Sequence, residues 1–161
     1  AWSWLEENFD EDTCAFALSN SMAGRMHISG DLLRCGENKR ALVRQAVELY
    51  KRYRRILPSS AVYHHTPGVI YHENDRLRIW EVTARSQDQA VIVAQRPDAP
   101  ETETVIYPRG LRREDQYTVT VFPDGLTRSL SGEELMGKGL RAEFPHPFTA
   151  KVFFMDKEHR T

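Results

Sequence analysis

The chain has 161 residues, of which 40% are hydrophobic and 28% are charged, and its formal net charge is −1 at pH 7. This composition is typical of globular proteins and argues against a disordered chain. The near-zero net charge gives no field that favours nucleic acid as a partner, and no apolar run approaches the roughly 18 to 20 residues that span a bilayer, so we expect neither nucleic acid nor a membrane as a partner.

The two cysteines, Cys14 and Cys35, form no CxxC pair and no disulfide framework. We therefore expect buried free thiols in a reducing compartment and predict a cytoplasmic protein. A secretory leader would have a basic start and an apolar core, and the opening residues AWSWLEE have neither. Because the first residue is Ala1 and not Met, a leader that has been removed stays an alternative.

Two short helices are predicted first. Trp2, Leu5 and Phe9 have the spacing of one helical face, and residues 14–23 form a second helix that the Asp-Thr pair before it caps. The acidic run between the two helices lacks the glycine and the alternating oxygen ligands of an EF-hand loop. We expect a solvated loop there and no calcium site.

A short strand is predicted at residues 25–29, where apolar and polar residues alternate. Ser29, Gly30 and Asp31 lie at its end, and in an α/β barrel the carboxyl ends of the strands carry the functional residues. A carboxylate next to a hydroxyl can bind the hydroxyl groups of a sugar. These three residues are therefore candidate substrate-binding residues, and the alternative is that Asp31 only caps the turn that follows.

Residues 37–57 have a strong helical pattern that Pro58 ends. One stripe of this helix is apolar and consists of Val43, Ala46, Val47, Tyr50, Tyr53 and Leu57. The opposite face is basic, and because the rest of the chain is acidic, we interpret it as a solvated or interdomain face.

After Pro58 the apolar period changes from 3.6 to 2, which indicates strands. The predicted strands are residues 61–64, 69–72, 77–85, 90–94, 102–107, 117–122, 127–129 and 150–155. Ser131 begins a capped helical turn before the last of them. Short strands separated by turns predict an antiparallel β-sandwich, so the fold class is mainly β, preceded by helical segments.

Several motifs resemble, in the same order, the C-terminal part of family 36 glycoside hydrolases, the melibiase-type α-galactosidases. Residues 24–32 (GRMHISGDL) resemble the last strand of that family's (β/α)8 barrel, and residues 42–54 resemble its last helix. Segments that resemble its C-terminal β-sandwich are 89–97 (QAVIVAQRP), 111–122 (LRREDQYTVTVF) and 131–140 (SGEELMGKGL).

This resemblance implies two domains: residues 1–58 as the last strand–helix portion of a TIM-barrel-like domain, and residues 59–161 as the sandwich. It implies a parent enzyme that hydrolyses terminal α-galactosides with retention, through an aspartate nucleophile and a second carboxylic acid on earlier barrel strands. The chain contains neither those strands nor the KxD motif of the nucleophile. We therefore expect no catalytic residue and no cofactor in it, a structural role, and a galactoside as partner only through the parent enzyme.

Two other functions stay open. The first is a stand-alone sandwich module that binds carbohydrate or protein, for which an exposed Trp80 would be a sugar-stacking surface and a buried Trp80 would be core. The second is an independent enzyme that uses acidic pairs of this chain, whose spacing alone identifies no catalytic pair. Those pairs are Glu73 and Asp75, Glu101 and Glu103, and Glu133 and Glu134.

Three histidines, His64, His65 and His72, flank a predicted turn. Their spacing is not that of a standard metal-ligand set, so we predict no metal site. The apolar stripe of the long helix must fold back onto the sandwich or be covered by a second copy, which makes a homo-oligomer an expected partner.

Overall fold

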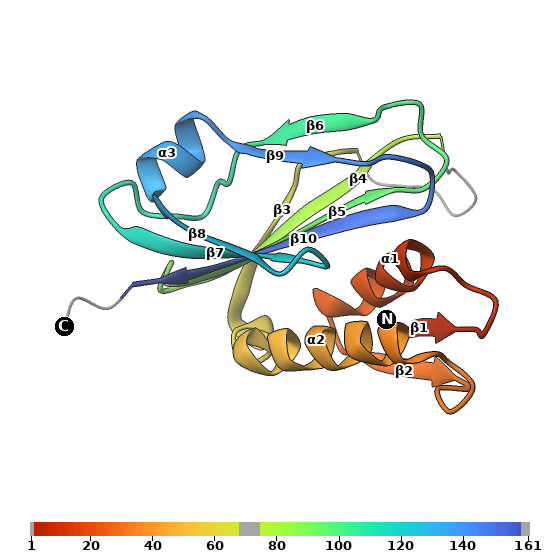
Figure 1. Cartoon of the computed structure of the whole chain (residues 1–161). Coiled ribbons are helices and arrows are strands. Elements are labelled where there is room, and N and C mark those ends of the chain that lie inside the picture. Colours follow the sequence, from red (N-terminus) through yellow and green to blue (C-terminus); the bar gives the residue numbers. More distant parts are fainter. Residues whose placement is uncertain (1, 68–74, 159–161) are drawn as a thin grey trace.

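The computed structural model describes residues 2–67 and 75–158 (Figure 1). The first part contains two strand–helix units, β1 (Trp2–Leu5), α1 (Glu11–Met22), β2 (His27–Gly30) and α2 (Glu37–Tyr53), and a short 3₁₀ turn, η1 (Leu57–Ser59). The second part contains β3 (Ser60–His64), β4 (Arg78–Ala84), β5 (Gln89–Arg96), β6 (Glu103–Ile106), β7 (Gln116–Phe122), β8 (Leu126–Ser131), α3 (Gly132–Gly137), β9 (Leu140–Glu143) and β10 (Thr149–Lys157).

The first predicted helix is wrong, because Trp2–Leu5 is strand β1. This strand pairs in parallel with β2, and its burial alternates, with Ser3 and Leu5 buried and the two tryptophans exposed. The spacing of Trp2, Leu5 and Phe9 also suits a helix, and the parallel partner β2, distant in the sequence, decides between the two structures. The chain thus has two strand–helix units where one was predicted.

The two helices differ from the prediction mainly at their ends. Helix α1 begins earlier than expected because the carboxylate of Asp10 caps it, accepting a hydrogen bond of 2.7 Å from the backbone N–H of Thr13. Helix α2 ends at Tyr53, ahead of Pro58, and the chain continues through a turn into η1. Of the described helices, none combines the length and apolarity that a membrane span requires.

The β part is built on a six-stranded antiparallel sheet in the order β3-β4-β5-β10-β7-β8, with a second antiparallel pair, β6-β9. The predicted strands match these elements to within a few residues, except for 69–72, which lies outside the described residues. Strand β9 was missed because it is short and follows a capped helix, although Leu140 and Ala142 alternate with exposed residues. The mainly β, antiparallel fold class is confirmed.

The large sheet is covered on both faces (Figure 1). In β5, Ala90 and Ile92 belong to a core shared with β6, β9 and α3, whereas Val91 and Val93 belong to a core shared with α1 and α2. Burial of both faces explains why this strand reads as a continuous apolar run. The sheet therefore separates the strand–helix units on one side from the β6-β9 pair on the other.

The apolar side of α2 folds back onto the sheet, which is the first of the two predicted alternatives. Ala46, Leu49 and Tyr53 are buried in the core on that side, and the Tyr53 ring lies 5.1 Å from the ring of Phe154 in β10. Leu49 was missing from the predicted stripe. This core contains side chains from both predicted domains, so the domain boundary at residue 58 stays a prediction. The predicted homo-oligomer also stays a prediction.

Candidate functional site

The predicted substrate-binding residues lie at the carboxyl end of β2, beside β1. Ser29 is half-buried and stands opposite Trp4 in the parallel register, and Gly30 stands opposite Leu5. A Cβ atom at Gly30 would lie 1.9 Å from the carbonyl oxygen of Leu5, and its φ of +110° also excludes other residues. Glycine is therefore required by the close approach of the two strands.

Asp31 is exposed and its carboxylate organises the following turn. Its Oδ1 accepts a hydrogen bond of 3.2 Å from the backbone N–H of Leu33, and its Oδ2 lies 3.2 Å from Nε of Arg34. This is the local role that the sequence left as the alternative. The carboxylate also stays open to solvent, so a role in binding a sugar hydroxyl remains a prediction.

The outer face of the β1-β2 pair carries exposed aromatic side chains that the sequence analysis did not identify. Trp2 and Trp4 are 75% and 58% exposed, and His27 stands opposite Trp2 on the same face. The indole N–H of Trp4 donates a hydrogen bond of 2.8 Å to the carboxylate of Glu6. The alternation of the sequence WSWL, with period two, was the signal for this face.

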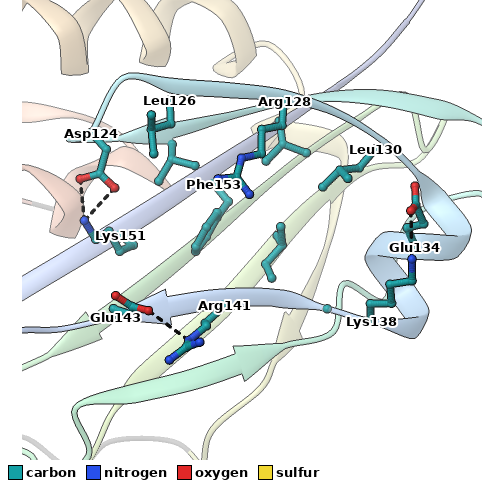
Figure 2. A pocket seen from close by; sticks show the side chains of 14 residues that line it. Asp124, Leu126, Arg128, Leu130, Glu134, Lys138, Arg141, Glu143, Lys151 and Phe153 are labelled. Carbon is teal, nitrogen blue, oxygen red and sulfur yellow. Dashed lines mark hydrogen bonds and ion pairs between the residues drawn. The ribbon is translucent and has the colours of Figure 1, made fainter.

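A groove of about 510 Å³ lies on the other side of the large sheet (Figure 2). Its floor comes from Val119 and Val121 in β7 and Phe153 in β10, and β9 forms the facing wall with Leu140. The ion pairs at its rim join Lys151 to Asp124 at 2.6 Å, Lys138 to Glu134 at 3.1 Å, and Arg141 to Glu143 at 3.1 Å. The groove is thus apolar at the bottom and charged around its opening.

Glu81 in β4 is fully buried and lies outside this groove. One of its carboxylate oxygens is 3.0 Å from Nε2 of His65 and accepts a bond of 2.9 Å from the backbone N–H of Arg109. The other accepts bonds from the hydroxyl of Thr83 at 2.8 Å and the backbone N–H of Gly110 at 2.9 Å.

The charge state of Glu81 follows from these contacts. Burial alone would raise the pKa of this carboxyl, but the hydrogen bonds from His65, the backbone and Thr83 hold its pKa below the usual value of 4.5. With both oxygens saturated by protein donors, Glu81 tethers the loop at residues 109–110 to β4 and has no free lone pair for a substrate.

The remaining predicted candidates take structural positions. His64 is exposed, His65 contacts Glu81, and His72 lies outside the described residues. Within residues 2–67 and 75–158, no group of three or more metal-ligating side chains is brought together. Trp80 is half-buried against the core on the α1–α2 side, which supports its interpretation as core.

In each of the three acidic pairs of the sequence, one member makes a local contact. Glu103 pairs with Arg141, Glu134 completes the capping box of α3, and Asp75 pairs with Arg76 at 3.5 Å. Glu73 lies outside the described residues. The described carboxylates therefore form no pair that is set apart as catalytic.

Comparison with known proteins gives a consistent result for the β part. Residues 77–155 match the glycosyl hydrolase family 36 C-terminal domain, which confirms the resemblance that the sequence motifs indicate. No curated protein matches the chain.

Solved structures extend the similarity to the strand–helix units. The chain is similar to a GH36 α-galactosidase from Geobacillus stearothermophilus in complex with stachyose, with a TM-score of 0.71 and 17% identity, over 98% of this chain and 22% of that one. It is also similar to the α-galactosidase from Lactobacillus brevis, with a TM-score of 0.65 and 20% identity, over 90% of this chain and 20% of that one. The chain thus spans about a fifth of the length of these structures, and the TM-scores show a shared fold.

Proposed function

We propose that the chain, whose residues 77–155 match the glycosyl hydrolase family 36 C-terminal domain, is the C-terminal part of a longer glycoside hydrolase in which its role is structural. The observation that carries the proposal is the parallel β1-β2 pair, with α1 and α2 on one face, directly ahead of the matched domain. The chain spans only about a fifth of the length of its structural relatives, which supports the same interpretation.

The β1-β2 pair has the features expected of the last two strands of a (β/α)8 barrel. Parallel strands joined by helices occur in sheets whose two faces are both covered, and a barrel closes only when eight strands are present. Here the face opposite the helices exposes Trp2 and Trp4, and a two-stranded sheet is marginal in water. We propose that preceding barrel strands pair with this sheet and cover its tryptophans.

We further propose that the parent enzyme hydrolyses α-galactosides with retention and that Ser29, Gly30 and Asp31 lie near the sugar. Support comes from their position at the carboxyl end of a parallel strand, where barrel enzymes carry their functional residues. A cytoplasmic location is proposed because Cys14 and Cys35 are both buried free thiols.

The proposal is tested by incubating the chain with p-nitrophenyl α-galactoside. We expect no release of nitrophenol, because we assign the nucleophile and the acid to earlier barrel strands of the parent enzyme, and turnover above the buffer rate would contradict the structural role. In the full-length parent, Asp31→Ala is expected to raise KM, with the exposed Asp98→Ala as the control. Unchanged kinetics for Asp31→Ala would remove this residue from the sugar site.

A stand-alone carbohydrate-binding module is the second candidate, and the exposed Trp2 and Trp4 are the observation that favours it. Calorimetric titration of the chain with galactose and with raffinose separates the two functions. Heat of binding that is lost in Trp4→Ala would favour the module, and no heat at millimolar sugar would count against it.

A further inference from the structure

Strand β8 is an edge strand whose inner face has an unusual pattern. In the register with β7, Leu126 stands opposite Val121, Arg128 opposite Val119, and Leu130 opposite Tyr117. Val119 and Tyr117 are buried in the core on the β6-β9 side, so Leu126, Arg128 and Leu130 point toward that same side. A guanidinium thus projects from the middle of the edge strand over the apolar floor of the groove (Figure 2).

Arg128 differs from the other charged residues of the groove in its pairing. The carboxylates of Asp124, Glu134 and Glu143 form ion pairs with basic side chains at the rim. Arg128 is exposed and makes no hydrogen bond or ion pair with any residue in the described part of the chain. Because this exposed guanidinium is not committed to a carboxylate of the described residues, it can pair with an acidic side chain of a ligand.

The edge of β8 is also open for backbone pairing. The sheet order ends at β8, and within the described residues no strand pairs with its second side. An added strand would place its inward side chains directly opposite those of β8, with Cβ atoms about 5 Å apart. The distance from Leu126 to Leu130 is about 13 Å along an extended strand, which suits a segment of five residues.

We propose that the β8 edge and the groove beneath it bind an extended peptide segment with the pattern apolar–x–acidic–x–apolar. The acidic side chain would lie opposite Arg128, and the two apolar side chains would lie opposite Leu126 and Leu130 and close the open side of the groove. Backbone hydrogen bonds to β8 supply affinity, and the alternating side chains supply specificity. This binding site is separate from the proposed sugar site, which lies at the carboxyl end of β2.

The same arrangement disfavours two other occupants. In a two-fold pairing of β8 with a second copy, centred on Arg128, two guanidinium groups would stand opposite each other, which is unfavourable. The floor of the groove offers a sugar ring no aromatic face for stacking, because Phe153 is only 3% exposed. Arg128 therefore rejects self-pairing and selects an acidic strand.

Two fluorescein-labelled peptides, TVTETVT and TVTKTVT, test the proposal by fluorescence anisotropy. In both, the valines and the central charged residue share one face of an extended strand. We expect the glutamate peptide to bind the wild-type chain about tenfold more tightly than the lysine peptide. In Arg128→Glu the order should reverse, and the control Arg55→Glu, with the same charge change on an exposed residue after α2, should keep the wild-type order.

Equal affinities for the two peptides, no anisotropy change at up to about 1 mM, or an unchanged order in Arg128→Glu would overturn the proposal. A second measurement follows the rejection of self-pairing. In sedimentation experiments, the apparent mass of Arg128→Val should rise with protein concentration more than that of the wild type. The apparent mass of Arg55→Val should follow the wild type. If Arg128→Val sediments like the wild type, Arg128 does not prevent self-association through the β8 edge.

Discussion

Replacement of Glu81 by glutamine tests whether a buried carboxylate holds the loop at residues 109–110 onto β4. The native carboxylate accepts from four donors, two on each oxygen. An amide keeps the shape but presents one N–H₂ group in place of an oxygen. The amide nitrogen fits best on the side of His65, whose ring can change tautomer and accept, and the backbone N–H of Arg109 then loses its acceptor.

The expected cost follows from that count. A buried donor without an acceptor costs about 1–3 kcal/mol, and the other bonds weaken because they are no longer assisted by charge. We therefore expect Glu81→Gln to lower the free energy of unfolding by about 2–4 kcal/mol at pH 7, measured by urea denaturation. Glu133→Gln, an exposed acid at the start of α3, is the control and should change it by less than about 0.5 kcal/mol.

The pH dependence gives the same reasoning an independent test. The pKa of Glu81 is lower in the folded chain than its usual value of 4.5, so its contribution to stability is present above that value and is lost as the pH falls through the folded pKa. Glu81→Gln should lack this part of the acid dependence, so the difference in stability between the two proteins should shrink toward acid pH. A loss below about 1 kcal/mol at pH 7, or the same difference at acid and neutral pH, would refute the reasoning.

Three further substitutions probe other parts of the fold. Tyr53→Phe removes a hydroxyl that is buried without a hydrogen-bond partner among the described residues, so we expect the urea midpoint to rise by the equivalent of about 1 kcal/mol; a lower midpoint would contradict this. Gly30→Ala should reduce the free energy of unfolding by about 2 kcal/mol or more and lower the melting temperature, because the added Cβ would collide with the carbonyl of Leu5. An unchanged melting temperature would mean that β1 and β2 separate easily. Ser131→Ala removes the N-cap of α3 and should cost about 1 kcal/mol in urea denaturation, whereas Ser131→Asp should restore most of it.

Much of the β part could be predicted from the sequence because its signals are local. Strand β5 is a continuous apolar run, β7 alternates from Tyr117 to Val121, and Ser131 begins the capped helical turn that the sequence indicates. Strand β1 could not be recognised in the same way, because four residues with two tryptophans carry both periods and only the distant partner β2 selects the strand.

The sites depended even more on tertiary structure. Asp31 was found from its place after a strand, and the sequence also indicated its capping role. Glu81 reads in the sequence as an ordinary polar position of a strand, and three of its four donors come from segments distant in the sequence, His65 and the backbone of residues 109–110. The groove required the register of β7 and β8, which alone shows that Arg128 points inward.

The position of β10 in the sheet has a consequence for how the protein is made. This strand is the last of the chain to be synthesised among the described elements, yet it lies in the sheet between β5 and β7 and contributes to both cores. On the ribosome, β5 and β7 therefore emerge long before the strand that joins them, with their apolar faces uncovered. Assembly of both cores must therefore wait until β10 has emerged, and until then the apolar faces of β5 and β7 lack their central partner.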